Sequence, residues 1–462
     1  MKRLILIMTF GLLSLGVIEA QAQSQSEGAQ QLTLTLDDAI EIALSDNPTV
    51  KVANLEIERY DYVRKQAIAN LYPQVDVSGQ YAYSIRTQQM AENLSFGGKN
   101  TFNFAGNIAL PLFVPSVYRQ MKMTRTQMAA AVESARANRI DLVASVRSSF
   151  YNVLLAEQAL EVLLEAVATT QRVVDNTKNL YDNGLAAEYD YITAQVQLSN
   201  LTPQVLQART AIELTKLQLK MYLSLPEGTD VSVVGRLNDF RDQVMLGEDY
   251  STDISENTTL KSLDLNRELL VHQEKLIQTT RMPTIAAFGS ISYIGQERVD
   301  LSGLLGGGAR AASSAVAEQS KFWWQYPISI GAQISIPIFA GFKKTNQLRE
   351  VRNQISQLDL QRQYVEESVK IQVQQAIHTL LTARENMQSN ALTVDQAQKA
   401  YDIALARYNA GGGTILELNS SQLNLTQAQL NYSQSIYNYL EAEALYKKAL
   451  GNEEYVDSVN VE

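Results

Sequence analysis

The fold is decided by the stretch Lys343–Ala410, which reads KKTNQLREVRNQISQLDLQRQYVEESVKIQVQQAIHTLLTARENMQSNALTVDQAQKAYDIALARYNA. It includes neither glycine nor proline, and Gly411 follows it. A second stretch of the same length and kind, Ser116–Asn183, is followed by Gly184. Because nothing in either stretch interrupts a helix and each residue adds about 1.5 Å, each predicts a rod of roughly 100 Å. This pattern argues against a compact catalytic core and favours a long tube.

The rods belong to a unit that occurs twice. Leu110–Phe113 aligns with Ile336–Phe339, whereas Leu71–Pro73 aligns with Arg281–Pro283 at a shorter spacing along the chain. The second unit is therefore longer between these two points. Since insertions collect in exposed loops, we place its roughly 16 extra residues in the Gly/Ala/Ser-rich stretch Gly303–Ser320. We expect this stretch to be an exposed loop tip.

The first residues predict a secretory signal peptide. Lys2 and Arg3 precede the apolar run Leu4–Val17, and Ala20–Ala22 supplies a cleavage site of small residues, so the mature chain is expected to begin at Gln23. The run is too short for a membrane span.

Each unit predicts the order helix, strand, loop, strand, long helix, glycine turn and shorter return helix. Thr35 together with Asp38 predicts a cap at the start of the first helix, and Asn47-Pro48 predicts a break in that helix. Pro203 predicts a kink in the first return helix. We expect a signal peptide at 1–22, a linker at 226–254 and a tail at 451–462. The first repeat, 23–225, is expected to contain a β-hairpin at 74–113, a long helix at 116–183 and a return helix at 188–223. The second repeat, 255–450, is expected to contain a β-hairpin at 284–339, a long helix at 343–410 and a return helix at 414–450.

Composition excludes several classes of protein. A net charge of −10 argues against nucleic-acid binding, which requires a basic surface. The chain has no cysteine, so it has no disulfides and no thiolate metal site. After the signal peptide no run of 18 apolar residues occurs, and we therefore expect no membrane-spanning helix.

The strands show a strict period of two. Apolar Val75, Val77, Tyr81, Tyr83 and Ile85 alternate with polar or small residues, and the same pattern marks 102–112 and one long strand from Trp324 to Ile338. Such strands have one apolar and one polar face, as in a soluble sandwich or a membrane barrel. Their length and their aromatic residues favour the barrel, with an interfacial girdle at Tyr81, Tyr83, Trp323, Trp324 and Tyr326.

Four strands cannot close a barrel, which needs about eight. An open sheet edge is not tolerated in lipid, so copies of the chain must combine. The second rod carries an apolar stripe typical of coiled coils, which a pore-free scaffold would also explain. That stripe comprises Leu348, Val351, Ile355, Leu358, Val365 and Val369.

The order of these parts resembles the TolC outer-membrane efflux family. The resemblance rests on the duplication, on the strand-hairpin-helix order and on the paired turns Tyr181–Leu185 and Tyr408–Gly412. The opening segment Leu34–Ile40, followed by Asn47-Pro48, is also similar, and so is its echo from Leu260. Together these features cover essentially the whole mature chain.

The resemblance implies a mixed α and β membrane protein that forms a homotrimer. Its twelve-stranded β-barrel, four strands per chain, would lie in the outer membrane of a Gram-negative bacterium. The barrel would continue into a periplasmic α-helical, coiled-coil-like barrel. The implied partners are a periplasmic adaptor (membrane fusion) protein and an inner-membrane transporter.

The resemblance also implies a periplasmic gate at Asp190, Tyr408 and Glu417. Asp190 takes the place of an acid that accepts bonds from the second repeat, and Tyr408 that of the tyrosine that contacts it. Glu417 falls in an acidic constriction ring, where three carboxylates round an axis would repel one another and attract cations. The alternative is that all three are ordinary residues of the helix surface.

This chain departs from the family pattern at two gate positions. Gly413 stands where the family has a latch arginine, and Ser420 where it has a second ring aspartate. Arg407 is the candidate replacement for the latch. The resemblance further implies that a periplasmic adaptor grips the two turns, which comprise Asn183, Gly184, Leu185, Ala410, Gly411 and Gly412. Each glycine also suits a helix C-cap with positive φ.

No pattern in the sequence indicates an enzyme. His272 and His378 lack a second ligand type at metal-site spacing, and Gly306–Gly308 lacks the lysine of a phosphate loop. Met121, Met123 and Met128 favour packing over soft-metal binding. We therefore expect no cofactor, and a passive exit duct of a tripartite efflux pump. The alternatives are the outer-membrane component of a type I protein secretion system and a secreted periplasmic coiled-coil scaffold without a pore.

Overall fold

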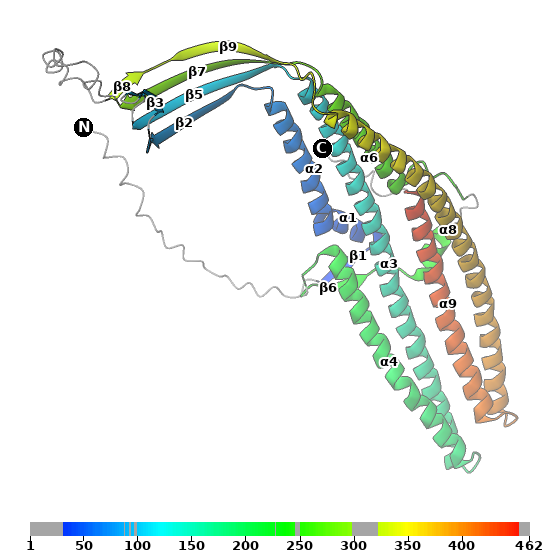
Figure 1. The fold of residues 1–462 in the computed structure, drawn as a ribbon. Helices are drawn as coiled ribbons and strands as arrows, with labels where there is room; N and C mark the ends of the chain where they lie inside the picture. The colour runs from blue at the N-terminus through cyan, green and yellow to red at the C-terminus, as the bar shows by residue number, and fades with distance from the viewer. Residues whose placement is uncertain are drawn as a thin grey trace, which may run out of the picture.

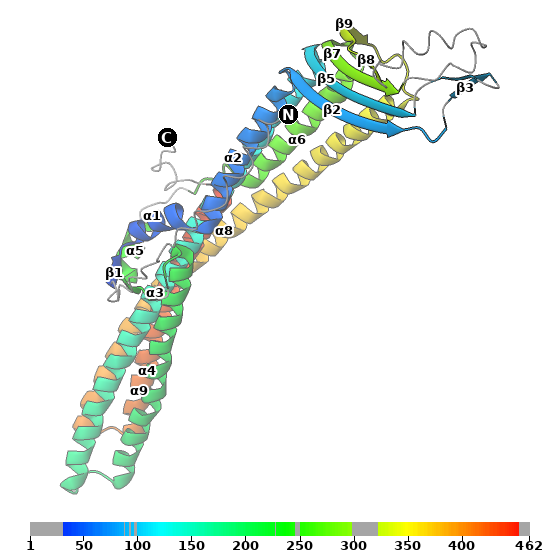
Figure 2. The same ribbon diagram turned by 90° about the vertical axis from the view of Figure 1, so that its left-hand side faces the viewer.

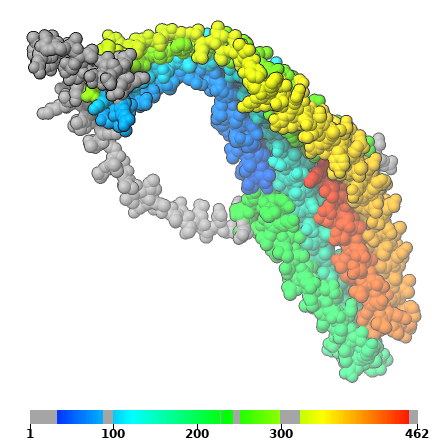
Figure 3. Space-filling view, in the orientation of Figure 1, coloured from blue at the N-terminus to red at the C-terminus, as the bar shows by residue number. Residues whose placement is uncertain are grey.

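A β-sheet lies at one end of the molecule, and long helices extend from it (Figure 1). The computed structural model describes residues 31–86, 88–91, 94–96, 99–226, 228–244, 250–297 and 322–451. The predicted signal peptide, the predicted loop Gly303–Ser320 and the tail after Gly451 lie outside these residues. In the space-filling view the strands continue without a break into the helical part (Figure 3).

The sheet is antiparallel and is built from both predicted hairpins. Its strands are β2 (Gln74–Tyr83), β5 (Asn100–Phe113), β7 (Thr284–Glu297), β8 (Phe322–Gln325) and β9 (Ile328–Ser335). The path runs β2-β5-β7, and β8 and β9 both pair with β7. Between β2 and β5 a separate small hairpin pairs β3 (Gln88–Ala91) with β4 (Leu94–Phe96).

The prediction of one strand from Trp324 to Ile338 was wrong. The structure divides it into β8 and β9, because Pro327 has no N–H to donate and interrupts the ladder. The carbonyl of Pro327 still accepts from the Ser292 N–H at 3.0 Å, so both pieces follow the same edge of β7. The strand also ends at Ser335, short of Pro337.

The register gives the sheet two different faces. Residues directly opposite one another across an antiparallel ladder share a face. One face carries Tyr81 opposite Phe102, Phe102 opposite Gly295 and Gly295 opposite Trp324. The other face carries a polar row in which Asp76, Asn107, Ser290 and Ser329 lie opposite one another in turn.

Two antiparallel helix pairs form the far end of the molecule (Figure 2). α3 (Pro115–Asp182) packs against α4 (Glu188–Leu223), and α8 (Lys343–Asn409) packs against α9 (Ile415–Leu450). Nearer the sheet, α2 (Pro48–Ala69) and α6 (Thr258–Thr279) pack on α3. α4 continues through Pro203 as one helix. Among the residues that the structure describes, no helix combines the length and the apolar character needed to cross a membrane.

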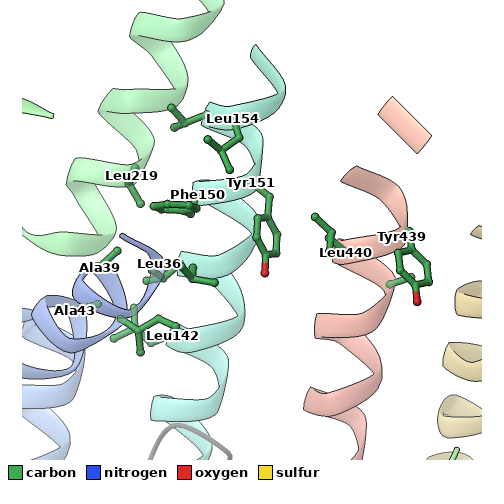
Figure 4. Packing of buried hydrophobic residues seen from close by; sticks show 14 of the residues in the cluster. Leu36, Ala39, Ala43, Leu142, Phe150, Tyr151, Leu154, Leu219, Tyr439 and Leu440 are labelled. Atoms are coloured by element: carbon green, nitrogen blue, oxygen red, sulfur yellow. The ribbon is translucent and has the colours of Figure 1, made fainter. Parts of the chain in front are cut away.

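The largest apolar core lies midway along the helices. Here α1 (Leu36–Asp46) packs against α3, as Figure 4 shows for Phe150, which lies between Leu219 of α4 and Leu36. A small parallel sheet covers this core and pairs β1 (Gln31–Leu34) with β6 (Asp230–Val233). The sequence placed only a linker or side structure at 226–254, a segment that contains β6 and also α5 (Leu237–Val244), which packs on α9.

Two buried asparagines hold the repeats in equivalent ways. Asn47 caps α2 by accepting from the Thr49 N–H, and its Nδ2 donates to the Tyr222 carbonyl at 2.8 Å. Asn257 caps α6, and its Nδ2 donates to the Ala449 carbonyl at 2.9 Å. The two asparagines occupy equivalent positions of the repeats in the sequence alignment, and so do the two carbonyls. Each cap therefore also ties the start of one helix to the end of a return helix.

Candidate functional site

The two turns at the far end of the helical part have the same backbone geometry. Gly184 and Gly411 both have φ of +72°, where an added side chain would be strained. In the first turn the Leu185 N–H donates to the Leu180 carbonyl at 2.8 Å, and in the second the Gly412 N–H donates to the Arg407 carbonyl at 2.9 Å. These are Schellman caps, and they confirm the predicted C-cap role of the two glycines.

The turns differ in what they present to solvent. Leu185 leaves 76% of its surface exposed at the first turn, where Tyr181 and Tyr189 are also exposed. The second turn has Gly412 at the equivalent position. At Gly413 an added Cβ would lie 3.1 Å from the Tyr408 backbone nitrogen, tighter than ordinary contact. A larger residue at this position would therefore require the backbone of the turn to shift by a few tenths of an ångström.

Arg407 spans the second turn. Its Nη2 donates to the Gly412 carbonyl at 3.2 Å, and its Nη1 lies 3.9 Å from Oε2 of Glu417. Both side chains are more than half exposed, so solvent screens the ion pair and its contribution to stability is small. Arg407 thus joins the end of α8 to the start of α9, where Thr414 caps the helix by accepting from the Glu417 N–H.

Tyr408 is a core residue of the far end. It is 8% exposed, and its hydroxyl shares a 3.0 Å hydrogen bond with Oγ1 of Thr177 on α3. Its neighbours in the same apolar cluster include Val173, Val174 and Leu418. Within one chain Tyr408 therefore joins α3 to α8. Thr177 was missed at the sequence level, because a threonine within a long helix carries no signal of its own.

Asp190 lies in the first turn of α4 and is half-buried. In the described part of the chain, no hydrogen bond or ion pair joins its side chain to Tyr408 or Glu417. The three predicted gate residues thus lie near the same end of the molecule but make separate contacts. Their acidic members, Asp190 and Glu417, stand at the N-termini of α4 and α9, where the helix dipole favours negative charge.

A groove of about 540 Å³ opens between α3 and α8 next to these turns. α9 forms its floor with Leu418 and Gln422, and Arg172 and Asp402 stand on its walls. Gln422 is 8% exposed, and its Oε1 is buried with no hydrogen-bond partner among the residues that the structure describes. An apolar floor with an unpaired acceptor and charged walls suits a polar segment of another protein.

The predicted aromatic girdle divides between the two faces of the sheet. Tyr81, Tyr83 and Trp324 share the apolar face. Trp323 lies opposite Gln296 on the other face, which places it away from Trp324. This outcome could have been read from the sequence, because adjacent strand residues point to opposite faces. Tyr326 falls between β8 and β9 and is 74% exposed.

The aromatic side chains of the apolar face contact one another across the strands. Trp324 stacks on Tyr293 with 4.7 Å between ring centroids, and Tyr81 lies 4.9 Å from Phe102. Gly295 makes room for this row, since a Cβ there would lie 2.5 Å from the Trp324 ring. Tyr81 also donates to Asn100 at 2.7 Å, which marks a polar end to the apolar face.

The two histidines are placed apart. Nε2 of His272 on α6 lies 3.4 Å from Oε1 of Glu268 in the same helix. His378 lines a second groove, between α8 and α9. Within the described ranges no group of three His, Asp or Glu side chains has metal-binding geometry.

Comparison with known proteins places the chain in a family. The family model "Outer membrane efflux protein" matches residues 39–224 and 254–452. The toluene efflux pump outer membrane protein TtgC of Pseudomonas putida is 23% identical over 446 residues, which cover 90% of this chain and 82% of TtgC. The outer membrane protein TolC of Escherichia coli is 21% identical over 393 residues, 84% of this chain and 76% of TolC.

The fold also matches solved structures. The CmeC outer membrane channel of Campylobacter jejuni superposes with a TM-score of 0.69 at 17% identity, over 90% of this chain and 85% of CmeC. The family match covers most of both predicted repeats and includes the two turns at the far end of the helices. The chain therefore belongs to the outer membrane efflux protein family.

Proposed function

We propose that this outer-membrane chain forms, as a homotrimer, the passive exit duct of a tripartite efflux pump. The observation that carries the proposal is the sheet, which is open, apolar on one face and polar on the other. Val77 and Ile330 of the apolar face are 82% and 88% exposed in the single chain. Lipid would cover this face, and the polar face would line a water-filled lumen.

The free edges of the sheet support closure by copies of the same chain. β2 and β9 form its two borders, and they run in opposite directions because each neighbouring pair in β2-β5-β7-β9 is antiparallel. β9 of one copy can therefore pair antiparallel with β2 of the next. Three copies would give a twelve-stranded barrel, and α3, α4, α8 and α9 would continue it into the periplasm.

We further propose that a periplasmic adaptor docks at the two turns and in the groove between α3 and α8. The exposed Leu185 offers an apolar contact, and the groove offers Gln422 and Arg172 as hydrogen-bonding groups. The adaptor would connect the duct to an inner-membrane transporter, which supplies the energy. In this proposal the chain would consist of two repeats, 23–225 and 255–450, joined by the linker 226–254, as the sequence predicts.

The experiment that tests the duct combines location with conduction. We expect the mature protein in the outer-membrane fraction as a trimer that opens ion-conducting pores in planar bilayers. A monomeric, freely soluble periplasmic protein would support the scaffold without a pore. Deletion of the gene should sensitise cells to small toxic compounds, whereas loss of a secreted protein alone would favour type I secretion.

The gate has its own test. We propose that Asp190 and Glu417 narrow the periplasmic mouth, because both carboxylates lie close to the turns and, among the described residues, the one ion pair they form is the long, exposed contact between Glu417 and Arg407. Asp190→Ala combined with Glu417→Ala should raise the single-channel conductance. The matched control, Asp182→Ala with Glu188→Ala, removes the same charge at the same end and should not. Equal conductance of the two variants would remove Asp190 and Glu417 as gate residues.

A further inference from the structure

The segment that joins β9 to α8 presents apolar side chains to solvent. Ile338, Phe339 and Phe342 are 94%, 75% and 69% exposed, and the two phenylalanine rings meet edge to face with 5.6 Å between centroids. The segment directly follows β9, whose even-numbered residues Ile328, Ile330 and Ile334 lie on the apolar face of the sheet. We call Phe339, Phe342, Lys343 and Arg349 the junction patch.

The backbone of the junction patch is held in an unfavourable conformation. Gly341 and Phe342 have φ of +58° and +59°. Phe342 is one of only two non-glycine residues in the described part of the chain with positive φ, a conformation that costs roughly 1 kcal/mol or more in a bulky residue. Packing inside the chain does not account for this, because the ring is mostly exposed. The left-handed residue thus coincides with an aromatic ring that is exposed at the start of α8.

Four cations lie along the chain close to the exposed rings, at the start of α8 and at the end of α6. Lys343 and Arg349 are exposed, and within the described residues neither forms an ion pair. On the neighbouring helix end, Nη2 of Arg281 donates to Oγ1 of Thr345 at 3.1 Å, and Nζ of Lys344 donates to the Thr280 carbonyl. α3 starts at the same level and carries no acidic residue before Glu133.

These charges oppose what the helices alone would favour. The positive end of a helix dipole favours Asp and Glu, and α1, α4 and α9 have acids in their first turns. α2, α3, α6 and α8 have none there, and α8 alone of these begins with two lysines. In a chain of net charge −10, cations at the border of an apolar face indicate an anionic partner at that level.

We propose that the junction patch binds the headgroups of anionic phospholipids in the periplasmic leaflet of the outer membrane. Phe339 and Phe342 insert among the acyl chains, and Lys343 and Arg349 bind the headgroup phosphates. The patch fixes the depth at which the strands pass into the helices. It depends on the membrane location of the chain and not on which pump it serves.

The test is lipid binding to the purified, assembled protein, measured by native mass spectrometry. Phosphatidylglycerol and phosphatidylcholine with identical acyl chains are titrated, so that only the headgroup charge differs. The wild type should prefer phosphatidylglycerol. The combined change Lys343→Gln with Arg349→Gln should lower the affinity for that lipid by about fivefold for each charge removed. The combined change Phe339→Ser with Phe342→Ser should lower the affinity for both lipids.

Two controls separate the patch from general charge and from misfolding. Lys178→Gln with Lys399→Gln removes two exposed cations near the far end and should leave phosphatidylglycerol binding unchanged. Lys343→Arg with Arg349→Lys should retain it. Equal binding of the two lipids, equal losses in both charge variants, or displacement of the lipid by inorganic phosphate would overturn the proposal. The proposal would also be overturned if only the binding of lipopolysaccharide depended on these cations. Any of these results would leave the proposed duct intact.

Discussion

At the scale of single residues, the far end of the helical part is held by specific polar contacts. The hydroxyl pair of Thr177 and Tyr408 is buried in an apolar cluster, where a polar group without a partner is costly. Arg407 crosses the second turn at the surface, where its contacts with Gly412 and Glu417 are weak. The buried pair should therefore contribute more than the exposed arginine to holding α8 against α3.

Tyr408→Phe should loosen the contact between α3 and α8. The change leaves Oγ1 of Thr177 buried without its partner, at a cost of about 1 to 3 kcal/mol. We expect faster amide hydrogen exchange at the ends of α3 and α8, and a higher single-channel conductance. Tyr401→Phe is the control, because Tyr401 is equally buried and its hydroxyl forms no hydrogen bond within the described residues. Equal effects of the two changes would reduce Tyr408 to a packing residue.

The sequence predicted single residues where the backbone restricts the choice of side chain. Gly184 and Gly411 were predictable as C-caps because few other residues tolerate positive φ. Thr177 was not predictable, since its partner lies 231 positions away on another helix. The face of Trp323 was available from the period of two, but grouping residues by aromatic type concealed it.

At the scale of elements, the ends of helices carry more information than their middles. Thr35 and Asp38 form a complete capping box: the Thr35 side chain and N–H both donate to the Asp38 carboxylate, and the Asp38 N–H donates to the threonine oxygen. The long stretches without glycine or proline predicted α3 and α8, whereas β8 and β9 required attention to a single proline. Helix-breaking residues were thus better guides than the alternating pattern.

Asp38 predicts how the start of α1 responds to acid. The hydrogen bond from the Thr35 side chain, followed by that from its backbone, holds the pKa of Asp38 below its ordinary 3.8. A lowered pKa means that the contribution to stability is complete above pH 3.8 and is lost as the pH falls through the folded-state pKa. Asp38→Asn should therefore lower the melting temperature at pH 7, with a difference that shrinks below pH 3.8. A constant difference across that range would contradict the capping role.

The second turn offers a comparison among neighbouring glycines. Gly411→Ala should cost about 1 to 2 kcal/mol through backbone strain alone, because φ is +72° and no atom lies near the added Cβ. Gly412→Ala is the matched control, since its Cβ would meet only an ordinary contact at 3.8 Å. Hydrogen exchange of the turn amides should rise in the first variant alone. Similar exchange in both would mean that the turn does not need its left-handed residue.

At the scale of the whole molecule, one chain is visibly incomplete. The apolar face of the sheet is uncovered, and β2 and β9 leave unpaired backbone groups at its borders. The sequence predicted the need for further copies, because four strands cannot close a barrel. It did not predict the small parallel sheet of β1 and β6, whose strands lie near the start of the first repeat and just after its end. Long-range pairing of that kind leaves no local pattern.

Disulfide cross-linking can test the pairing of copies, because the chain has no cysteine of its own. Ser78→Cys on β2 is combined in turn with Ser329→Cys, Gln333→Cys or Ser335→Cys on β9, all on the polar face. At least one combination should give covalent dimers and trimers on a denaturing gel after oxidation. Each single cysteine variant should stay monomeric there. If every combination stays monomeric, the sheet is not closed by β2 and β9.

The opposite directions of β2 and β9 have a consequence for stoichiometry. Because the strands alternate in direction from β2 to β9, β9 of one copy is antiparallel to β2 of the next in a ring of any size. Rings of two, three or four copies could therefore all close through antiparallel pairs. The direction of the strands by itself therefore does not fix the number of subunits. We infer that the number of subunits is set by how the helices of neighbouring copies pack side by side, far from the lipid. On this view, repacking residues far out in the periplasm would change the width of the hole in the membrane.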